Sequence, residues 1–126
     1  MRKLLAFLAL QMLLLGSVYC AAFDVNEDDM REIEDTTKNL DSSVLLKKGK
    51  SAETEAREIL AYFKQVERFY AAKGDASDAA EFARKSHTSA AEILRALESK
   101  EFDAAANAMS ALTRNCKACH DVYKTK

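Results

Sequence analysis

Two cysteines and a histidine stand close together near the end of this chain, in the stretch NCKACHDVYKTK. They are Cys116, Cys119 and His120, in the order C-x-x-C-H. On a helix, residues three and four apart lie on the same side, so the two thiols and the imidazole share one face. Two thiols at this spacing can add to the two vinyl groups on one edge of a porphyrin, while the imidazole reaches the iron. The pattern therefore predicts covalent attachment of one haem c.

Three other interpretations of these residues are open. A dithiol redox pair is expected near a strand-helix unit, and no strand pattern is evident. A zinc site needs four ligands, so Cys116, Cys119 and His120 would have to recruit His87, and no second pair has zinc-like spacing. The cysteines could also be an ordinary buried pair of free thiols.

The N-terminus has the three parts of a secretory signal peptide. Arg2 and Lys3 form a basic region, and an apolar run from Leu4 to Leu15 follows. This run is shorter than the about twenty residues that a bilayer span needs. We expect cleavage after Ala22, which predicts a periplasmic protein with no membrane span in its mature form. The alternative is a lipoprotein that keeps a lipidated Cys20 at its N-terminus.

The composition favours one helical domain spanning residues 23–126. The 126-residue chain has no proline, only three glycines and a formal net charge of −1. Alanine, leucine, glutamate and lysine dominate, and these residues favour helices. A nearly neutral chain offers no electrostatic reason to bind nucleic acid.

Apolar and small residues recur with spacing three and four in four successive runs, which predicts four amphipathic helices. The first run is Met30, Ile33, Thr37, Leu40 and Val44; the second is Ala52, Ala56, Ile59, Phe63, Val66 and Tyr70; the third is Ala76, Ala79, Ala83, Ser86, Ala90, Ile93 and Leu97; the fourth is Phe102, Ala105, Met109, Leu112, Cys116, Cys119 and Tyr123. Short connections make sequential helices antiparallel neighbours. The sequence thus predicts an all-α, up-down-up-down four-helix bundle.

The expected helix boundaries follow from glycines and capping residues. Gly49 suits the position just past the first helix, with Ser51 capping the second. Gly74 suits the end of the second helix, with Asp75 capping the third. The third and fourth helices should join near residues 99–101.

An exported four-helix bundle with C-x-x-C-H in its last helix resembles the cytochrome c′ family, the class II c-type cytochromes. The small carriers of class I place this motif near the N-terminus instead. The resemblance is most specific in CKACHDVYK, where Tyr123 and Lys124 follow the histidine. It implies that Cys116 and Cys119 carry the thioether bonds and that His120 is the proximal ligand of the haem iron.

Met30 is the candidate for the sixth iron ligand. His120 lies about six residues from the end of the bundle, or about 9 Å along the axis. The same level on the antiparallel first helix falls at residues 29–33, where Met30 lies on the apolar run. The family resemblance points to the same place, because its electron-transfer members carry a methionine ligand early in the first helix. Its gas-binding members have an apolar side chain there, over an open iron.

His87 is the rival ligand, since it is the only other histidine. Counting from a third helix that begins near Asp75 places His87 about 9 Å deeper than the iron. We therefore expect His87 to be structural or partly exposed. The same counting places Val66, Phe69 and other large side chains in the walls of the haem pocket. The remaining wall residues are Tyr70, Phe82 and Ala83.

These observations predict a periplasmic electron carrier rather than an enzyme, because no catalytic acid-base pair is visible. Redox proteins of the periplasm are the expected partners, and the resemblance implies a possible homodimer. Three basic residues surround the motif, namely Arg114, Lys117 and Lys124. They could face haem propionates or an acidic partner. Each one is also explained as a solvated charge at the end of a helix, where the dipole favours cations. The alternative function is a gas-binding protein that takes nitric oxide or carbon monoxide at a five-coordinate iron.

Overall fold

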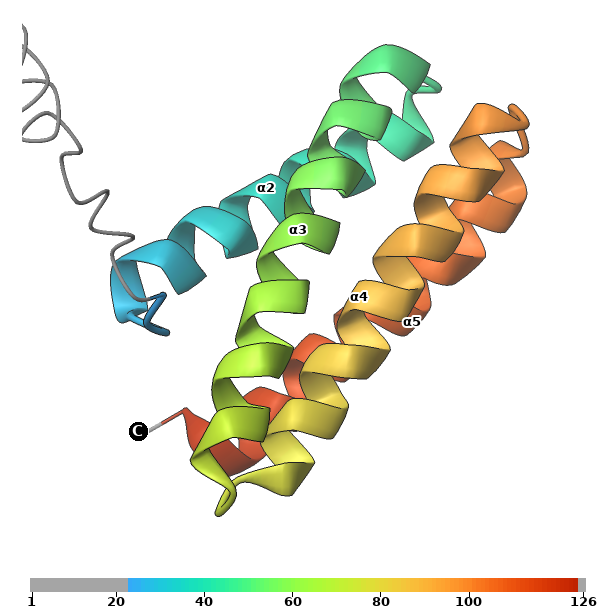
Figure 1. Ribbon diagram of the computed structural model, residues 1–126. Helices are drawn as coiled ribbons and strands as arrows, with labels where there is room; N and C mark the ends of the chain where they lie inside the picture. Colours follow the sequence, from blue (N-terminus) through green and yellow to red (C-terminus); the bar gives the residue numbers. More distant parts are fainter. Residues whose placement is uncertain (1–22, 125–126) are drawn as a thin grey trace, which may run out of the picture.

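The computed structural model describes residues 23–124 of the chain. The predicted signal peptide, residues 1–22 with Cys20, lies outside the described residues. The described part contains four helices and no strand, which confirms the all-α prediction. The helices are α2 (Glu27–Leu45), α3 (Gly49–Lys73), α4 (Ser77–Glu98) and α5 (Phe102–Tyr123). Short turns join them into an up-down-up-down bundle, with the α2–α3 and α4–α5 turns at the same end (Figure 1).

The core follows the four predicted runs, because the helical period turns each run toward the other helices. All seven members of the third run are buried, from Ala76 at the N-cap of α4 to Leu97. The largest fully buried side chains are leucines and isoleucines from all four helices. They are Leu40, Ile59, Ile93, Leu97 and Leu112. They lie toward the turn end and the middle of the bundle, away from C-x-x-C-H.

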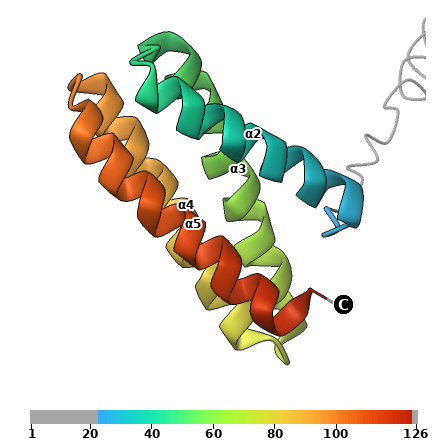
Figure 2. The same cartoon turned by 180° about the vertical axis from the view of Figure 1, so that it is seen from behind.

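The four helices are not equally packed. α3 contacts α4 most extensively and α4 contacts α5 next, whereas α2 packs mainly on α3 and has its smallest contact with α5. The two cartoon views agree that α2 leans away from α5 toward its own N-terminal end (Figures 1 and 2). The bundle is therefore tightest among α3, α4 and α5, and loosest where α2 begins and α5 ends.

The start of α2 is fixed by a side-chain cap. The side-chain oxygen of Asn26 accepts a hydrogen bond of 2.9 Å from the backbone N–H of Asp29. Glu27 and Asp28 add negative charge to the first turn, where the helix dipole favours it. This cap places Met30 within the first turns of α2.

The prediction that Gly49 follows the end of the first helix is wrong. Leu46 is the C-cap of α2, and Lys47 adopts the left-handed conformation with φ 54°. Lys48 then precedes α3 without a side-chain cap, so Gly49 is the first residue of α3 and Ser51 is inside it. Backbone hydrogen bonds satisfy the last carbonyls of α2, and this allows a lysine to occupy the position that glycine usually takes.

The turn between α3 and α4 confirms one predicted boundary and corrects another. Gly74 ends α3 in the left-handed conformation, with φ 73°. Asp75 does not cap α4, because the N-cap is Ala76, which makes no side-chain hydrogen bond. Instead, the carboxylate of Asp78 accepts a hydrogen bond of 3.0 Å from the backbone N–H of Ala79. The α4–α5 connection lies at residues 99–101, as expected.

We expect glycine at Lys47 or at Lys100 to stabilise the protein. Both lysines have positive φ, at 54° and 59°, which costs a side-chain-bearing residue free energy that glycine does not lose. Each variant should raise the free energy of unfolding by about 0.5–1 kcal/mol in denaturant titrations. Gly74→Ala is the matched control and should lower it by a similar amount, because no atom lies within 4 Å of the added Cβ and only the conformation is strained. If the free energy of unfolding is the same in all three variants as in the wild type, this account is contradicted.

Candidate functional site

The C-x-x-C-H residues lie on the last turns of α5. Cys116, Cys119 and His120 are all partly buried, and the two cysteines are free thiols. Cys116 packs against the hydrophobic core. Beyond Leu112, α5 contributes no fully buried side chain in its described part. The motif therefore lies where the core opens at the end of the bundle.

Both thiols are in surroundings that favour the protonated form. Burial raises the pKa of Cys116 to about 11, with a further contribution from Cys119. Burial and then the negative charge of Asp78 raise the pKa of Cys119. A reactive C-x-x-C redox pair needs a lowered thiol pKa. The raised pKa values thus weigh against the dithiol interpretation.

The end of α5 is tied to α4 and α3 by Tyr123. Its hydroxyl donates a hydrogen bond to the carboxylate of Asp78 in the first turn of α4. This bond raises the pKa of Tyr123 to about 12 and lowers that of Asp78. The ring of Tyr123 also lies 6.1 Å from that of Tyr70 on α3, measured between centroids. These contacts hold the helix turn that carries Cys119 and His120 against its neighbours.

Met30 and His120 occupy equivalent places on α2 and α5. Met30 comes three residues after the first residue of α2, and His120 comes three residues before the last residue of α5. Three residues correspond to about 4.5 Å along a helix. The start of α2 and the end of α5 lie at the same end of the molecule in both views (Figures 1 and 2). Met30 is partly buried and packs against the core.

The imidazole of His87 lies beside the carboxylate of Glu67 in the α3–α4 interface. Its Nδ1 atom lies 2.8 Å from Oε2 of Glu67, and both side chains are largely buried. His87 is ten residues beyond the first residue of α4, or about 15 Å from the start of that helix. This position is deeper in the bundle than that of His120, in line with the structural role expected for His87.

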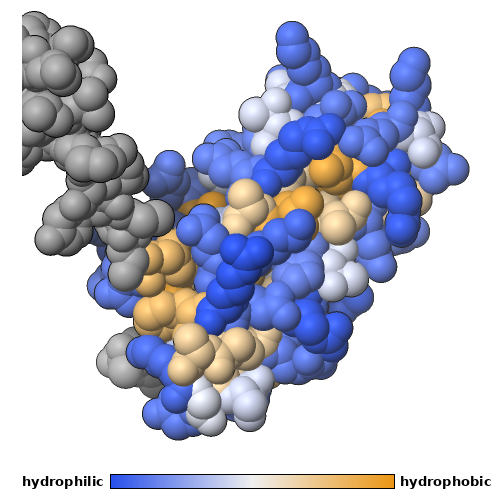
Figure 3. Space-filling model, in the orientation of Figure 1, coloured by the Kyte–Doolittle hydropathy of each residue, from blue (hydrophilic) through white to orange (hydrophobic). Residues whose placement is uncertain are grey.

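Large apolar side chains at this end of the bundle are only partly covered. They come from all four helices and from the residues before α2. They are Phe23, Val25, Met30, Phe69, Tyr70, Phe82 and Cys116. In the space-filling view, apolar surface gathers beside the start of α2 and the C-terminal half of α3 (Figure 3). This end therefore has apolar surface that the described chain does not cover.

The hydroxyl of Tyr62 is an unpaired buried donor near the start of α2. Tyr62 is 8 % exposed, and its hydroxyl has no hydrogen-bond partner among residues 23–124. Burial raises its pKa to about 12, with contributions from Asp29 and Tyr70, so it remains a donor. Buried donors normally have an acceptor. Two thiols, an imidazole and partly uncovered apolar side chains form a set that fits a flat, largely apolar haem, whereas Tyr62 lies about as deep in the bundle as His87.

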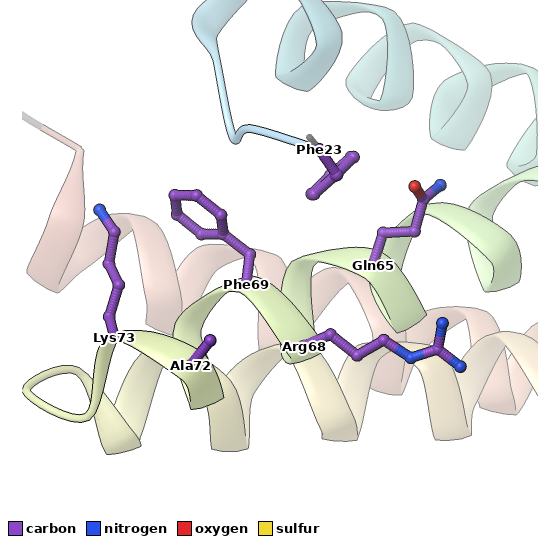
Figure 4. Close-up of a pocket in the computed structure, with 6 residues that line it drawn as sticks. All are labelled: Phe23, Gln65, Arg68, Phe69, Ala72 and Lys73. Carbon is purple, nitrogen blue, oxygen red and sulfur yellow. The ribbon is translucent and has the colours of Figure 1, made fainter. Parts of the chain in front are cut away.

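A separate hollow of about 450 Å³ lies on the outer side of α3. Phe23 covers it from the segment before α2, and Phe69, Arg68 and Lys73 line it from α3 (Figure 4). Lys73 Nζ lies 4.5 Å from the centroid of the Phe69 ring. None of the C-x-x-C-H residues lines this hollow, and Phe69, which was predicted as a wall of the haem pocket, faces it together with Phe23.

Tyr62 and Asp78 were not identified from the sequence as site residues. Tyr62 has a weak signal, because it precedes Phe63 of the second apolar run and widens that stripe. Asp78 has no such signal, since an acidic residue in a first helical turn is common.

One of the basic residues around the motif is paired on the exposed face of α5. Lys117 Nζ lies 2.8 Å from the carboxylate of Asp121, which agrees with the interpretation of Lys117 as a solvated charge.

No three His, Cys, Asp or Glu side chains within residues 23–124 converge on a point that could hold a metal ion, so the structure offers no support for the zinc alternative. Within the same residues, no helix combines the length and apolar character needed to cross a bilayer.

Comparison with known proteins finds no relative of this chain. No family model matches it, and neither the curated proteins nor the solved structures contain a match.

Proposed function

We propose that this protein is a monohaem c-type cytochrome of the periplasm that carries single electrons. The observation that carries the proposal is the placement of C-x-x-C-H. Its three side chains are partly buried at an end of the bundle where large apolar side chains from all four helices remain partly uncovered. A bound haem c supplies a single iron that alternates between the ferric and ferrous states. Redox proteins of the periplasm would be its partners.

Each residue of the site has a defined task in this proposal. Cys116 and Cys119 hold the haem covalently from one helix face, and His120 offers an imidazole nitrogen to the iron. Tyr123 and Asp78 fix the last turn of α5, which keeps the imidazole in position. The apolar side chains around the motif exclude water.

Met30 is the residue that we propose as the sixth iron ligand. It is partly buried, and its place on α2 corresponds to that of His120 on α5. A thioether ligand opposite a histidine raises the reduction potential of the iron. A six-coordinate iron held in this way suits electron transfer and leaves no position for a small gas.

The second candidate function is gas binding at a five-coordinate iron. The observation that favours it is the sparse contact between α2 and α5, which diverge toward the end where Met30 lies. If Met30 packs beside the iron without bonding to it, nitric oxide or carbon monoxide could bind there. Met30 thus decides between the two functions.

The intact mass of the exported protein tests haem attachment directly. Protein produced in a host that matures c-type cytochromes should exceed the mass of its processed chain by one haem. The haem should also remain attached in acidified acetone, because thioether bonds do not dissociate. The same spectrum tests export, since an N-terminus at Phe23 supports signal cleavage and a diacylglyceryl group on Cys20 supports the lipoprotein alternative. A mass equal to that of the bare chain would refute the haem proposal.

A further inference from the structure

The turn between α2 and α3 presents two leucines to solvent beside three lysines. Leu45 is 69 % exposed and Leu46 is 64 % exposed, the highest values among the large apolar residues of the described chain. Lys47, Lys48 and Lys50 follow directly and are also exposed. We call these five residues the tip. The tip lies at the end of the bundle opposite to the C-x-x-C-H motif (Figure 1).

The neighbouring turn shows that the backbone does not require these leucines. In the α2–α3 turn, Lys48 N–H bonds to Ser43 O and Lys47 N–H to Val44 O. In the α4–α5 turn, Glu101 N–H bonds to Ala96 O and Lys100 N–H to Leu97 O, which is the same pattern. The counterparts of the two leucines in that second turn are Glu98 and Ser99. Polar residues therefore satisfy the same geometry, and the exposed leucines need another explanation.

The lysines of the tip are available to an external partner. None of them forms an ion pair with another residue of the described chain. The α4–α5 turn at the same end contributes Lys100 as well as Glu98 and Glu101. Of these acids, Glu98 is already paired with Arg57 of α3 at 2.8 Å. The tip is thus a small apolar surface with a local excess of positive charge.

We propose that the tip binds the surface of a membrane that contains anionic lipid. Two adjacent leucines can enter the boundary between headgroups and acyl chains, while the three lysines remain at the level of the lipid phosphates. Each lysine near an anionic surface strengthens binding by about fivefold. This is reversible attachment to one leaflet. It would orient the bundle with its C-x-x-C-H end away from the lipid, and it does not depend on the haem proposal.

Sedimentation with lipid vesicles tests this proposal on the purified full protein. We expect the protein to bind vesicles of phosphatidylcholine mixed with phosphatidylglycerol, and to bind phosphatidylcholine alone at least about tenfold more weakly. High salt should weaken the binding, because it screens the lysines. Leu45→Glu with Leu46→Ser, which copies the α4–α5 turn, should reduce binding at least about tenfold. Lys48→Glu with Lys50→Glu should reduce it at least about 25-fold while leaving Lys47 in its left-handed conformation.

Lys64→Glu with Lys73→Glu is the matched control. It makes the same change in net charge on α3, outside the tip, and should retain most of the binding. Thermal melting should show that every variant folds, since all the substituted side chains are exposed. The wild type and the tip variants should be prepared with the same N-terminus, so that any contribution of residues 1–22 to vesicle binding is the same in all of them. The proposal is overturned if the wild-type protein does not bind vesicles, or if the wild type and the tip variants bind them equally. Absence of binding by the wild type would point to a protein partner for the tip instead.

Discussion

Replacing Cys116 and Cys119 together with alanine will give a protein without haem that melts more than about 10 °C below the wild type. The expected cause lies at the end of the bundle where the motif is placed. The buried residues at the start of α4 are small, namely its N-cap Ala76 with Ala79 and Ala83, and large side chains from the other helices stay partly exposed. Without a bound group to cover them, this end should be loosely packed. Visible absorbance and thermal melting followed by circular dichroism measure the two effects.

Single substitutions provide the control for this experiment. Cys116→Ala or Cys119→Ala alone leaves one thiol for attachment, so each single variant should keep part of the haem. The melting temperature of each single variant should lie between those of the wild type and the double variant. Near-ultraviolet circular dichroism should show that the double variant has lost fixed packing around its tyrosines. If the double variant melts cooperatively at the wild-type temperature, the site contributes nothing to the fold and the argument from uncovered side chains fails.

In the proposed haem protein, replacing Met30 with alanine should convert the iron from a low-spin to a high-spin state and open it to carbon monoxide. Loss of a thioether ligand should also lower the reduction potential by about 100 mV. The wild-type ferric protein should show the weak far-red absorption band of a methionine–iron bond, and the variant should lack it. Absorbance spectra with and without carbon monoxide, together with a redox titration, measure all three changes.

Two other variants show whether the effect belongs to Met30. Met109 is a buried core methionine on α5, so Met109→Leu should keep the wild-type spectrum. His87→Ala should also keep it, because the imidazole lies beside Glu67, deeper in the bundle than His120. A wild-type protein that is already high-spin and binds carbon monoxide would instead favour the gas-binding function. A spin change in the His87 variant would identify His87 as the ligand.

The helices could be predicted because their signal is repeated many times. Every third or fourth residue from Ile33 to Val44, for example, contributes to one buried stripe, so errors at single positions do not matter. The prediction of a helix end depends on one or two residues and is therefore less secure than the prediction of the helix itself. Gly74 was assigned correctly, whereas Lys47 occupies a left-handed position that a sequence pattern assigns to glycine. The backbone bonds that compensate for this choice are visible only in three dimensions.

The candidate site was predictable where its residues lie on one helix. Cys116, Cys119 and His120 are fixed relative to one another by the helical period, so their shared face follows from spacing alone. Contacts between helices do not follow in this way. The hydrogen bond from Tyr123 to Asp78 joins residues 45 positions apart, and the pairing of His87 with Glu67 also links two helices. Such pairs depend on the rotation of each helix, which an apolar stripe defines only coarsely.

The sparse packing of α2 has a consequence for how the protein opens. A helix that packs mainly on one neighbour loses few buried contacts when it detaches, so it separates at a lower free energy than the whole domain. α3, α4 and α5 share the larger contacts and can stay together as one cooperative unit. Cys116 packs against the core beside these helices, and the negative charge of Glu34 on α2 is one of the contributions that raise its pKa. Partial unfolding of this one helix can therefore expose apolar side chains of the core while the remaining three-helix unit stays folded.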